Sequence, residues 1–331
     1  MAMNENRHDE ISENESNPYL NEEGSDLILP KPTATPPKSK SQVWLKSISS
    51  LFLYVAIGYI FFNQNWLLVL VLSGVVIFHE LGHFLAMKIY NYKDLGIFFI
   101  PLMGAYVTGT KNEVSQKQSA IILLAGPVPG IILGIIIYFL AVNNNDYMLE
   151  RIAWILIYLN VLNLLPVHPL DGGQLLNRLF LDSYHIIGKI FIVLSAIAMG
   201  IFAWVISFYP LLIFPVMLLI RLFTDVQYDR LTNRLEDEGI DLDKDYNDLT
   251  DEEYWQIRNA LIRHSADYKD LSPAPPYAYA ENEYKVVSGI QSVLQRSLYQ
   301  DLSIGGKILV IIIWIACFFV PAWLSLPIRF F

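Results

Sequence analysis

Long stretches of this sequence carry no charged side chain, and that pattern restricts the possible folds more than any motif does. Asp, Glu, Lys and Arg are absent from residues 118–145, 152–170, 190–220 and 308–328. About 20 consecutive apolar residues suffice to cross the hydrocarbon core of a bilayer. The 331-residue chain is 54% hydrophobic and only 17% charged, and Cys317 is its single cysteine. We therefore expect a membrane protein rather than an ordinary soluble enzyme, a disordered protein or a disulfide scaffold.

Hydropathy predicts six or seven membrane spans. The candidate spans are 43–62, 66–90, 118–142, 149–165, 190–208, 211–223 and 308–326. The pair Tyr209-Pro210 favours a tight hairpin between the fifth and sixth candidates. One helix over 190–223 would be about 50 Å long, far longer than the hydrocarbon layer is thick. A single tilted span followed by an interfacial helix is the alternative. Lysines just before the first span place the N-terminus in the cytoplasm.

Residues 94–109, DLGIFFIPLMGAYVTG, are apolar but too short and too rich in strand-forming residues for a span. Irregular backbone at membrane depth needs protein or a water-filled cavity to satisfy it. We therefore expect a re-entrant β hairpin on the cytoplasmic side; an interfacial loop is the alternative. The predicted fold is a polytopic helical membrane protein with a short membrane-embedded β hairpin and a small soluble helical region.

Charge and composition divide the chain into four parts. We expect a disordered polar tail over 1–42, a transmembrane core over 43–224, a soluble acidic cytoplasmic region over 225–302 and a last span within 303–331. Residues 1–26 hold eight acidic residues and one basic residue, and residues 236–253 hold ten and one. Such acidic regions do not suggest a nucleic-acid partner.

The soluble region carries three local patterns. Thr250 with Glu253 forms a capping box that predicts a helix through about His264. Residues 272–280 read as a linker, and an apolar stripe over 286–294 predicts a packed helix. An acidic loop over 241–252 resembles a calcium-binding loop, but Tyr246 occupies the position that needs Gly, so a solvated loop is favoured.

The only fully charged side chain between Ser47 and Met87 is Glu80, in the sequence His79-Glu80-Leu-Gly-His83. Ionisable residues inside a span are costly and usually functional. Two histidines four residues apart share one helix face, so both imidazoles can bind one Zn²⁺ ion. Glu80 is then placed to act as a general base toward a water molecule that the ion activates, and to return the proton to the leaving amine.

A catalytic zinc ion needs a third protein ligand and one open position. Asp171 is the favoured candidate, since it lies on the same predicted cytoplasmic side as the two histidines. His168, three residues upstream, is the competing candidate.

Together, the HExxH motif in a span, Gly126-Pro127 in the next span and the element NLLPVHPLDGG resemble the site-2 protease family of intramembrane zinc metalloproteases. The likeness covers about Trp66 to Gly173. It implies one Zn²⁺ per chain held by His79, His83 and Asp171, with Glu80 as the catalytic acid and base. It also implies that Asn163 binds substrate, and that GIFFIPLMGAYV is the membrane-embedded strand segment. Gly104 in this segment is a second candidate for substrate binding.

The resemblance leads us to expect a multi-pass protease of a bacterial inner membrane, with its active site near the cytoplasmic face. Its substrate would be the transmembrane segment of another membrane protein, cut in regulated intramembrane proteolysis. Two other functions stay open. One is a transporter that uses His79, Glu80 and Asp171 as an ion relay, and the other is a non-catalytic membrane scaffold.

Overall fold

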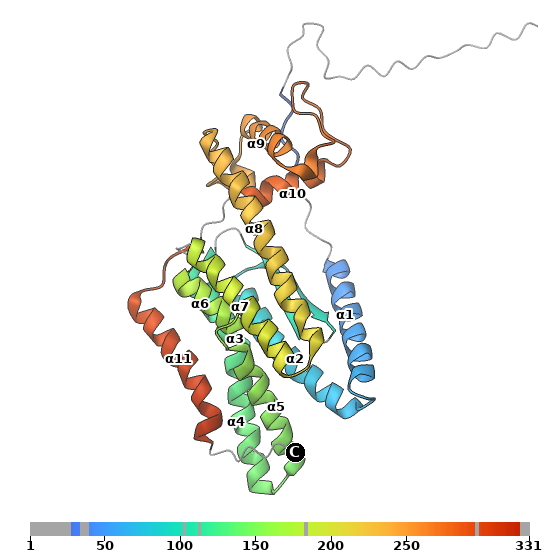
Figure 1. The fold of residues 1–331 in the computed structure, drawn as a ribbon, viewed down its shortest axis with the longest axis vertical. Helices are drawn as coiled ribbons and strands as arrows, with labels where there is room; N and C mark the ends of the chain where they lie inside the picture. The colour runs from blue at the N-terminus through green and yellow to red at the C-terminus, as the bar shows by residue number, and fades with distance from the viewer. Residues whose placement is uncertain are drawn as a thin grey trace, which may run out of the picture.

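The protein is described by a computed structural model that covers residues 28–33, 40–101, 104–111, 114–181, 185–294 and 298–324. The described chain is mostly helical (Figure 1). The helices are α1 Lys40–Phe61, α2 Trp66–Ile89, α3 Gln116–Ala125, α4 Pro127–Asn144, α5 Tyr147–Asn163, α6 Asp171–Leu176, α7 His185–Val205, α8 Ile213–Asp237, α9 Asp251–His264, α10 Glu283–Val293 and α11 Ile304–Trp323. The strands are β1 Lys93–Ile100, β2 Gly104–Thr110, β3 Val114–Ser115 and β4 Leu298–Tyr299. The short turns are a π-helix η1 Asn177–Leu181 and the 3-10 helices η2 Tyr209–Leu212, η3 Tyr246–Asp248 and η4 Ala266–Tyr268.

Within the described part of the chain, six helices are long and apolar enough to cross a membrane. They cover 41–61, 66–89, 116–144, 186–205, 209–237 and 304–321. Helix α5 is apolar too, but its 17 residues extend only about 26 Å, less than a hydrocarbon layer of about 30 Å. Many Leu, Ile, Phe and Trp side chains on these helices are exposed, as contact with lipid requires. The predicted polytopic helical fold is confirmed.

Strands β1 and β2 form the expected antiparallel hairpin, which pairs Ile97 with Val107 and Ile100 with Gly104. Helix α1 packs against β1. The hydroxyl of Ser50 accepts a hydrogen bond of 3.1 Å from the backbone N–H of Phe99. The backbone of the hairpin is therefore covered on one side by protein, as irregular structure at membrane depth requires. Residues 102 and 103 lie outside the described residues.

The predicted span 118–142 is divided into α3 and α4 at Gly126. Pro127 is the first residue of α4, and its missing backbone N–H interrupts the hydrogen-bond ladder of a continuous helix. At the other uncertain place, 190–223, the structure has two helices, α7 and α8, joined by a turn at η2. The two helices pack against each other through Ala196, Met199 and Leu218, which favours the hairpin over a single long helix.

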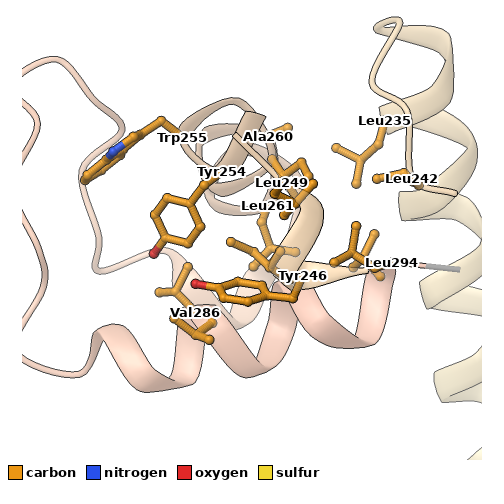
Figure 2. Close-up of a cluster of buried hydrophobic side chains, with 14 of the residues drawn as sticks. Leu235, Leu242, Tyr246, Leu249, Tyr254, Trp255, Ala260, Leu261, Val286 and Leu294 are labelled. Carbon is orange, nitrogen blue, oxygen red and sulfur yellow. The ribbon is translucent and has the colours of Figure 1, made fainter. Parts of the chain in front are cut away.

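Helix α8 continues beyond the apolar bundle and ends at Asp237, beside α9 and α10 (Figure 1). Its last turns share one apolar core with α9, η3 and α10. Figure 2 shows Tyr254 between Trp255 and Tyr246 in this core. We call the folded part around this core, residues 235–294, the soluble module. The core consists of Leu231, Leu235, Leu242, Tyr246, Leu249, Tyr254, Trp255, Ile257, Ala260, Leu261, Val286, Val287, Ile290, Val293 and Leu294.

The predicted capping box is confirmed: Thr250 and Glu253 exchange hydrogen bonds at the start of α9. The interpretation of 272–280 as a linker is wrong for its second half, because Tyr277 and Tyr279 pack on Trp255. The expected tail 1–42 also differs from the structure where it is described. Helix α1 begins at Lys40, and residues 28–33 lie on the soluble module. Residues 1–27 and 34–39 lie outside the described residues.

Candidate metal centre

Helix α2 presents three ionisable side chains from one turn to the interior of the bundle. His79, Glu80 and His83 are 6%, 5% and 8% exposed, in a helix whose other residues near them are apolar. The i and i+4 positions of the two histidines place both imidazoles on one helix face. Burying ionisable side chains costs free energy unless a counter-charge or a metal ion compensates them, so the cluster is a candidate functional site.

Asp171 is the third member of this cluster. It is the first residue of α6, and its carboxylate reaches back to α2. Its Oδ2 atom lies 3.0 Å from Nε2 of His79 and 3.3 Å from Nε2 of His83. The two Nε2 atoms are 3.0 Å apart. Within the described residues, these three side chains form one group close enough to hold a metal ion.

The outer ring nitrogens of the two histidines are held by fixed hydrogen-bond partners. Nδ1 of His83 lies 2.7 Å from the carbonyl oxygen of Ile122, which can only accept. Nδ1 of His79 lies 2.8 Å from Oδ1 of Asn160. The amide nitrogen of Asn160 donates to the carbonyl of Leu156 at 2.7 Å, so its oxygen faces His79. Both Nδ1 atoms must therefore carry the proton and donate it.

It follows that both Nε2 atoms carry lone pairs, and these lone pairs meet an Asp171 carboxylate oxygen at about 3 Å. Three such acceptors in mutual contact repel one another unless a cation lies among them. Ligand atoms of a tetrahedral zinc ion lie about 3.3 Å apart, given metal–ligand lengths of about 2.0 to 2.2 Å. The donor set and its spacing thus fit Zn²⁺, and hydrogen bonding by the outer nitrogens is the usual support for histidine ligands.

Two glycines of α4 and its junction allow this close packing. A Cβ atom on Gly126 would lie 2.3 Å from Nε2 of His83, and one on Gly130 would lie 2.3 Å from Nδ2 of Asn160. Real Cβ atoms do not approach neighbours so closely, so any side chain at either position would displace a ring or its support. The glycine of the Gly126-Pro127 pair is therefore explained by the space that His83 needs.

The cluster opens into a cavity of about 470 Å³. Glu80 lines it beside the two histidines, and so do Asn163 and Gly104. Strand β2 contributes residues 104–107 to one wall, and α8 contributes another wall through Phe214, Met217, Leu218 and Arg221. Each site residue expected from the sequence therefore lies at this one cavity.

His168, the competing third ligand, does not join the cluster. It is 6% exposed, and neither of its ring nitrogens has a hydrogen-bond partner among the described residues. Its backbone N–H donates to Ser195 of α7. Asn160 was missed by the sequence analysis. It is a polar residue in an uncharged apolar segment, three residues before Asn163, and that position is the signal that would have identified it.

The helices and the cluster together define a class: a multi-pass integral membrane protein with a buried His-His-Asp centre. Comparisons with known proteins then show which proteins this chain is similar to. The sequence model of Peptidase family M50 matches residues 67–147. A zinc metalloprotease of Methanocaldococcus jannaschii is 31% identical over 142 residues, which are 40% of this chain and 41% of that protein. Stage IV sporulation protein FB of Bacillus subtilis is 29% identical over 132 residues, 39% of this chain and 45% of that protein.

The chain thus matches less than half the length of either curated relative. A solved site-2 protease of Methanocaldococcus jannaschii aligns with 54% of this chain and 87% of that chain, with a TM-score of 0.41 and 22% identity. The region matched by the family model contains HExxH, both histidines and Gly126-Pro127. Over residues 67–147 the membrane core of this chain is thus similar to Peptidase family M50, and its two curated relatives match it over about 40% of this chain.

Proposed function

We propose that this protein is a zinc-dependent intramembrane endopeptidase that cuts the transmembrane segment of another membrane protein. The observation that carries the proposal is the convergence of three lone-pair donors, Nε2 of His79, Nε2 of His83 and Oδ2 of Asp171, inside an apolar bundle. The match of residues 67–147 to the model of Peptidase family M50 supports the same activity. One zinc ion per chain is the cofactor that this donor set favours.

A bound zinc ion would supply Lewis acidity, which polarises the scissile carbonyl and makes a water molecule easier to deprotonate. Glu80 then acts on protons. It follows His79 in the chain and lines the same cavity without being one of the three donors. Its carboxylate takes a proton from the attacking water and delivers it to the leaving amide nitrogen. The side-chain amide of Asn163, on the cavity wall, donates a hydrogen bond to the substrate or to the developing oxyanion.

A transmembrane helix hides its amides in internal hydrogen bonds, so the substrate must unwind locally before cleavage. Strand β2 offers such a segment new partners. In the described residues it pairs with β1 alone, and its residues 104–107 line the cavity. An extended substrate strand added beside β2 would lie along the cavity wall that faces α8. Gly104 leaves open space there, because a Cβ atom at this position would meet no heavy atom within 4 Å.

The location that we propose is a bacterial inner membrane, with the cavity near the cytoplasmic face. Lys46 at the start of α1 and the arginines along α8 support this orientation by the positive-inside rule. The soluble module, continuous with α8, would then be cytoplasmic. Regulated intramembrane proteolysis is the corresponding biological process.

Metal content tests the cofactor. Purified wild-type protein should hold about one zinc ion per chain, measured by inductively coupled plasma mass spectrometry, and His79→Ala should lose it. Ser73→Ala, a buried polar residue of the same helix outside the cluster, is the matched control and should keep it. A His79→Ala protein that retained full zinc would contradict the proposal.

Glu80→Gln tests the reaction. This variant should keep zinc but leave a single-span membrane protein uncut. Quantitative proteomics of membranes from cells with wild-type or Glu80→Gln protein should reveal an uncut membrane stub that accumulates only with the variant. Equal stub levels in both membranes, in cells where the protease is produced, would overturn the assignment of Glu80.

A further inference from the structure

Residues 28–33, which we call the N-terminal segment, lie on the soluble module although more than 200 residues separate them in the chain (Figure 1, the short blue stretch near α9). Three aromatic side chains hold the backbone. Trp255 Nε1 donates to the carbonyl of Leu29 at 2.7 Å, and the Tyr246 hydroxyl donates to the carbonyl of Pro32 at 2.8 Å. The Tyr279 hydroxyl donates to the carbonyl of Pro30. We call Tyr246, Asp251, Trp255 and Tyr279 the docking surface.

Lys31 is bound at both its backbone and its side chain. Its backbone N–H donates to Oδ1 of Asp251 at 2.7 Å. Its ammonium group donates to three backbone carbonyls around η3: those of Tyr246 at 3.0 Å, Asn247 at 2.7 Å and Leu249 at 2.5 Å. An ammonium has three N–H donors, so all three are used. The ammonium also lies 5.7 Å from the ring centre of Tyr246, within reach of a cation–π contact.

The sequence of the segment suits it to be bound in an extended form. Pro30 and Pro32 fix their own φ angles, and each biases the residue before it, Leu29 or Lys31, toward extended backbone. Little chain entropy is therefore lost on docking. The prolines lack N–H groups, so the docking surface must mainly donate hydrogen bonds to the carbonyl groups of the segment. The side chains of Trp255, Tyr246 and Tyr279 provide these donors. Leu29 adds an apolar contact with the core of the module.

Extended proline-rich segments are commonly bound on aromatic surfaces in this way. Contacts between aromatic rings fix the side chains of the docking surface. The ring centre of Trp255 lies 5.9 Å from that of Tyr279, on which it stacks, and 5.5 Å from that of Tyr254. The lysine contact adds selectivity. Three carbonyls arranged around one ammonium do not match the planar fork of an arginine.

We propose that the soluble module is a peptide-recognition site for an extended Leu-Pro-Lys-Pro segment, and that residues 28–33 of the same chain are its resident ligand. The partner chemistry is thus an apolar residue, two prolines and, between them, a lysine. A segment of this kind supplied by another molecule competes for the same surface.

The test uses the full-length protein in detergent micelles and a fluorescein-labelled peptide of residues 26–35, DLILPKPTAT. A Leu29→Asp, Lys31→Glu double variant frees the surface, because it removes the apolar contact and reverses the charge facing the carbonyls. Fluorescence polarisation should show saturable peptide binding to this variant. Binding to the wild-type protein should be weaker by on the order of tenfold or more, because the tethered segment occupies the site at high effective concentration.

Two changes test specificity. A peptide with Lys31→Arg should bind the double variant on the order of tenfold more weakly, since hydrogen bonds to a charged group are lost. Tyr279→Phe in the double variant removes one hydroxyl donor and should also weaken binding. Lys269→Ala, an exposed lysine of the same module, is the matched control and should change nothing.

Hydrogen exchange of α9 amides separates recognition from simple packing. If the double variant keeps these amides protected yet binds no peptide, the proposal is wrong. If it loses their protection, the segment is a structural part of the module rather than a ligand, and the proposal is also wrong. Equal binding of the lysine and arginine peptides would overturn the assigned selectivity.

Discussion

The side-chain oxygen of Asn160 lies 2.8 Å from Nδ1 of His79, on the side of the ring away from Asp171. Because the Asn160 amide nitrogen is committed to the carbonyl of Leu156, the oxygen cannot be exchanged for a donor without breaking that bond. Asn160 therefore fixes which nitrogen of His79 carries the proton. It is a positioning residue for the candidate metal centre, although it is not one of the three donors.

Replacing Asn160 by Ala should weaken zinc binding. Loss of the acceptor frees the orientation and protonation of His79, and loss of such a partner typically lowers metal affinity about 10- to 100-fold. Competition with a fluorescent chelator measures the affinity. Asn163→Ala, one turn further along α5, should leave zinc affinity unchanged and reduce cleavage instead. Equal zinc affinity in Asn160→Ala and wild type would refute the role of Asn160.

Gly126→Ala should also lower zinc content, for a steric reason. The added methyl group would lie 2.3 Å from Nε2 of His83, so the imidazole must move away from His79 and Asp171. The dissociation constant for zinc, measured by competition with a fluorescent chelator, should rise by at least about tenfold, which corresponds to a loss of about 1.4 kcal/mol of binding free energy. Gly74→Ala is the control on α2, where a methyl group would meet nothing within 4 Å. Equal zinc affinity of Gly126→Ala and Gly74→Ala would contradict the prediction.

Gly104→Ala separates the cavity wall from the metal centre. Gly104 has a φ angle of +107°, which an L side chain rarely adopts, while the space around it is open. The substitution therefore strains the hairpin by roughly 1–3 kcal/mol without a clash. We expect unchanged zinc content and cleavage reduced by about tenfold or more. Gly200→Ala on α7, where a side chain also meets open space, should keep both properties. Cleavage at the wild-type rate would exclude a role for this turn.

The stability of the soluble module, which lies outside the membrane helices, is expected to depend on pH. Burial raises the pKa of Glu283, but hydrogen bonds from Arg258 at 2.7 Å and Tyr254 at 2.5 Å outweigh it and hold the pKa below its ordinary value. A depressed folded-state pKa stabilises the module above the unfolded value of about 4.3. That contribution is lost as the pH falls through the folded-state pKa.

Glu283→Gln tests this network. It leaves the Arg258 charge buried without its partner, which should lower the opening free energy of α9 and α10 by roughly 3–5 kcal/mol at neutral pH. Hydrogen exchange of the α9 and α10 amides is measured from pH 6 to pH 3 and corrected for intrinsic exchange rates. In wild type the protection should decrease as the pH is lowered, and in the variant it should depend less on pH. Glu281→Gln, an exposed neighbour, should behave like wild type. A wild-type profile in Glu283→Gln would rule the network out as the cause.

The features that the sequence predicts well are those set by neighbours in the chain. The HExxH spacing needs only helix geometry to place His79 and His83 together, and the capping box of Thr250 needs only four residues. Asp171 required a further argument, because 88 positions separate it from His83. Its place beside α2 depends on how the loop after α5 returns to the bundle.

The features that the sequence does not predict depend on tertiary partners. Residues 28–33 have the composition of a disordered tail, and their order comes from Trp255, Tyr246 and Tyr279, more than 200 positions away. The same holds for Tyr277 in the supposed linker, which packs on Trp255. The break between α3 and α4 was readable from Pro127, but hydropathy alone joined them into one span.

The docking of residues 28–33 also imposes an order on biosynthesis. These residues leave the ribosome before any of the described helices, whereas Asp251, which binds Lys31, is made 220 residues later. The N-terminal segment therefore has no docking surface until most of the polypeptide has been translated. Chains that stop early, within the bundle, would keep this segment without a binding site, so an exposed Lys31 would mark an unfinished molecule.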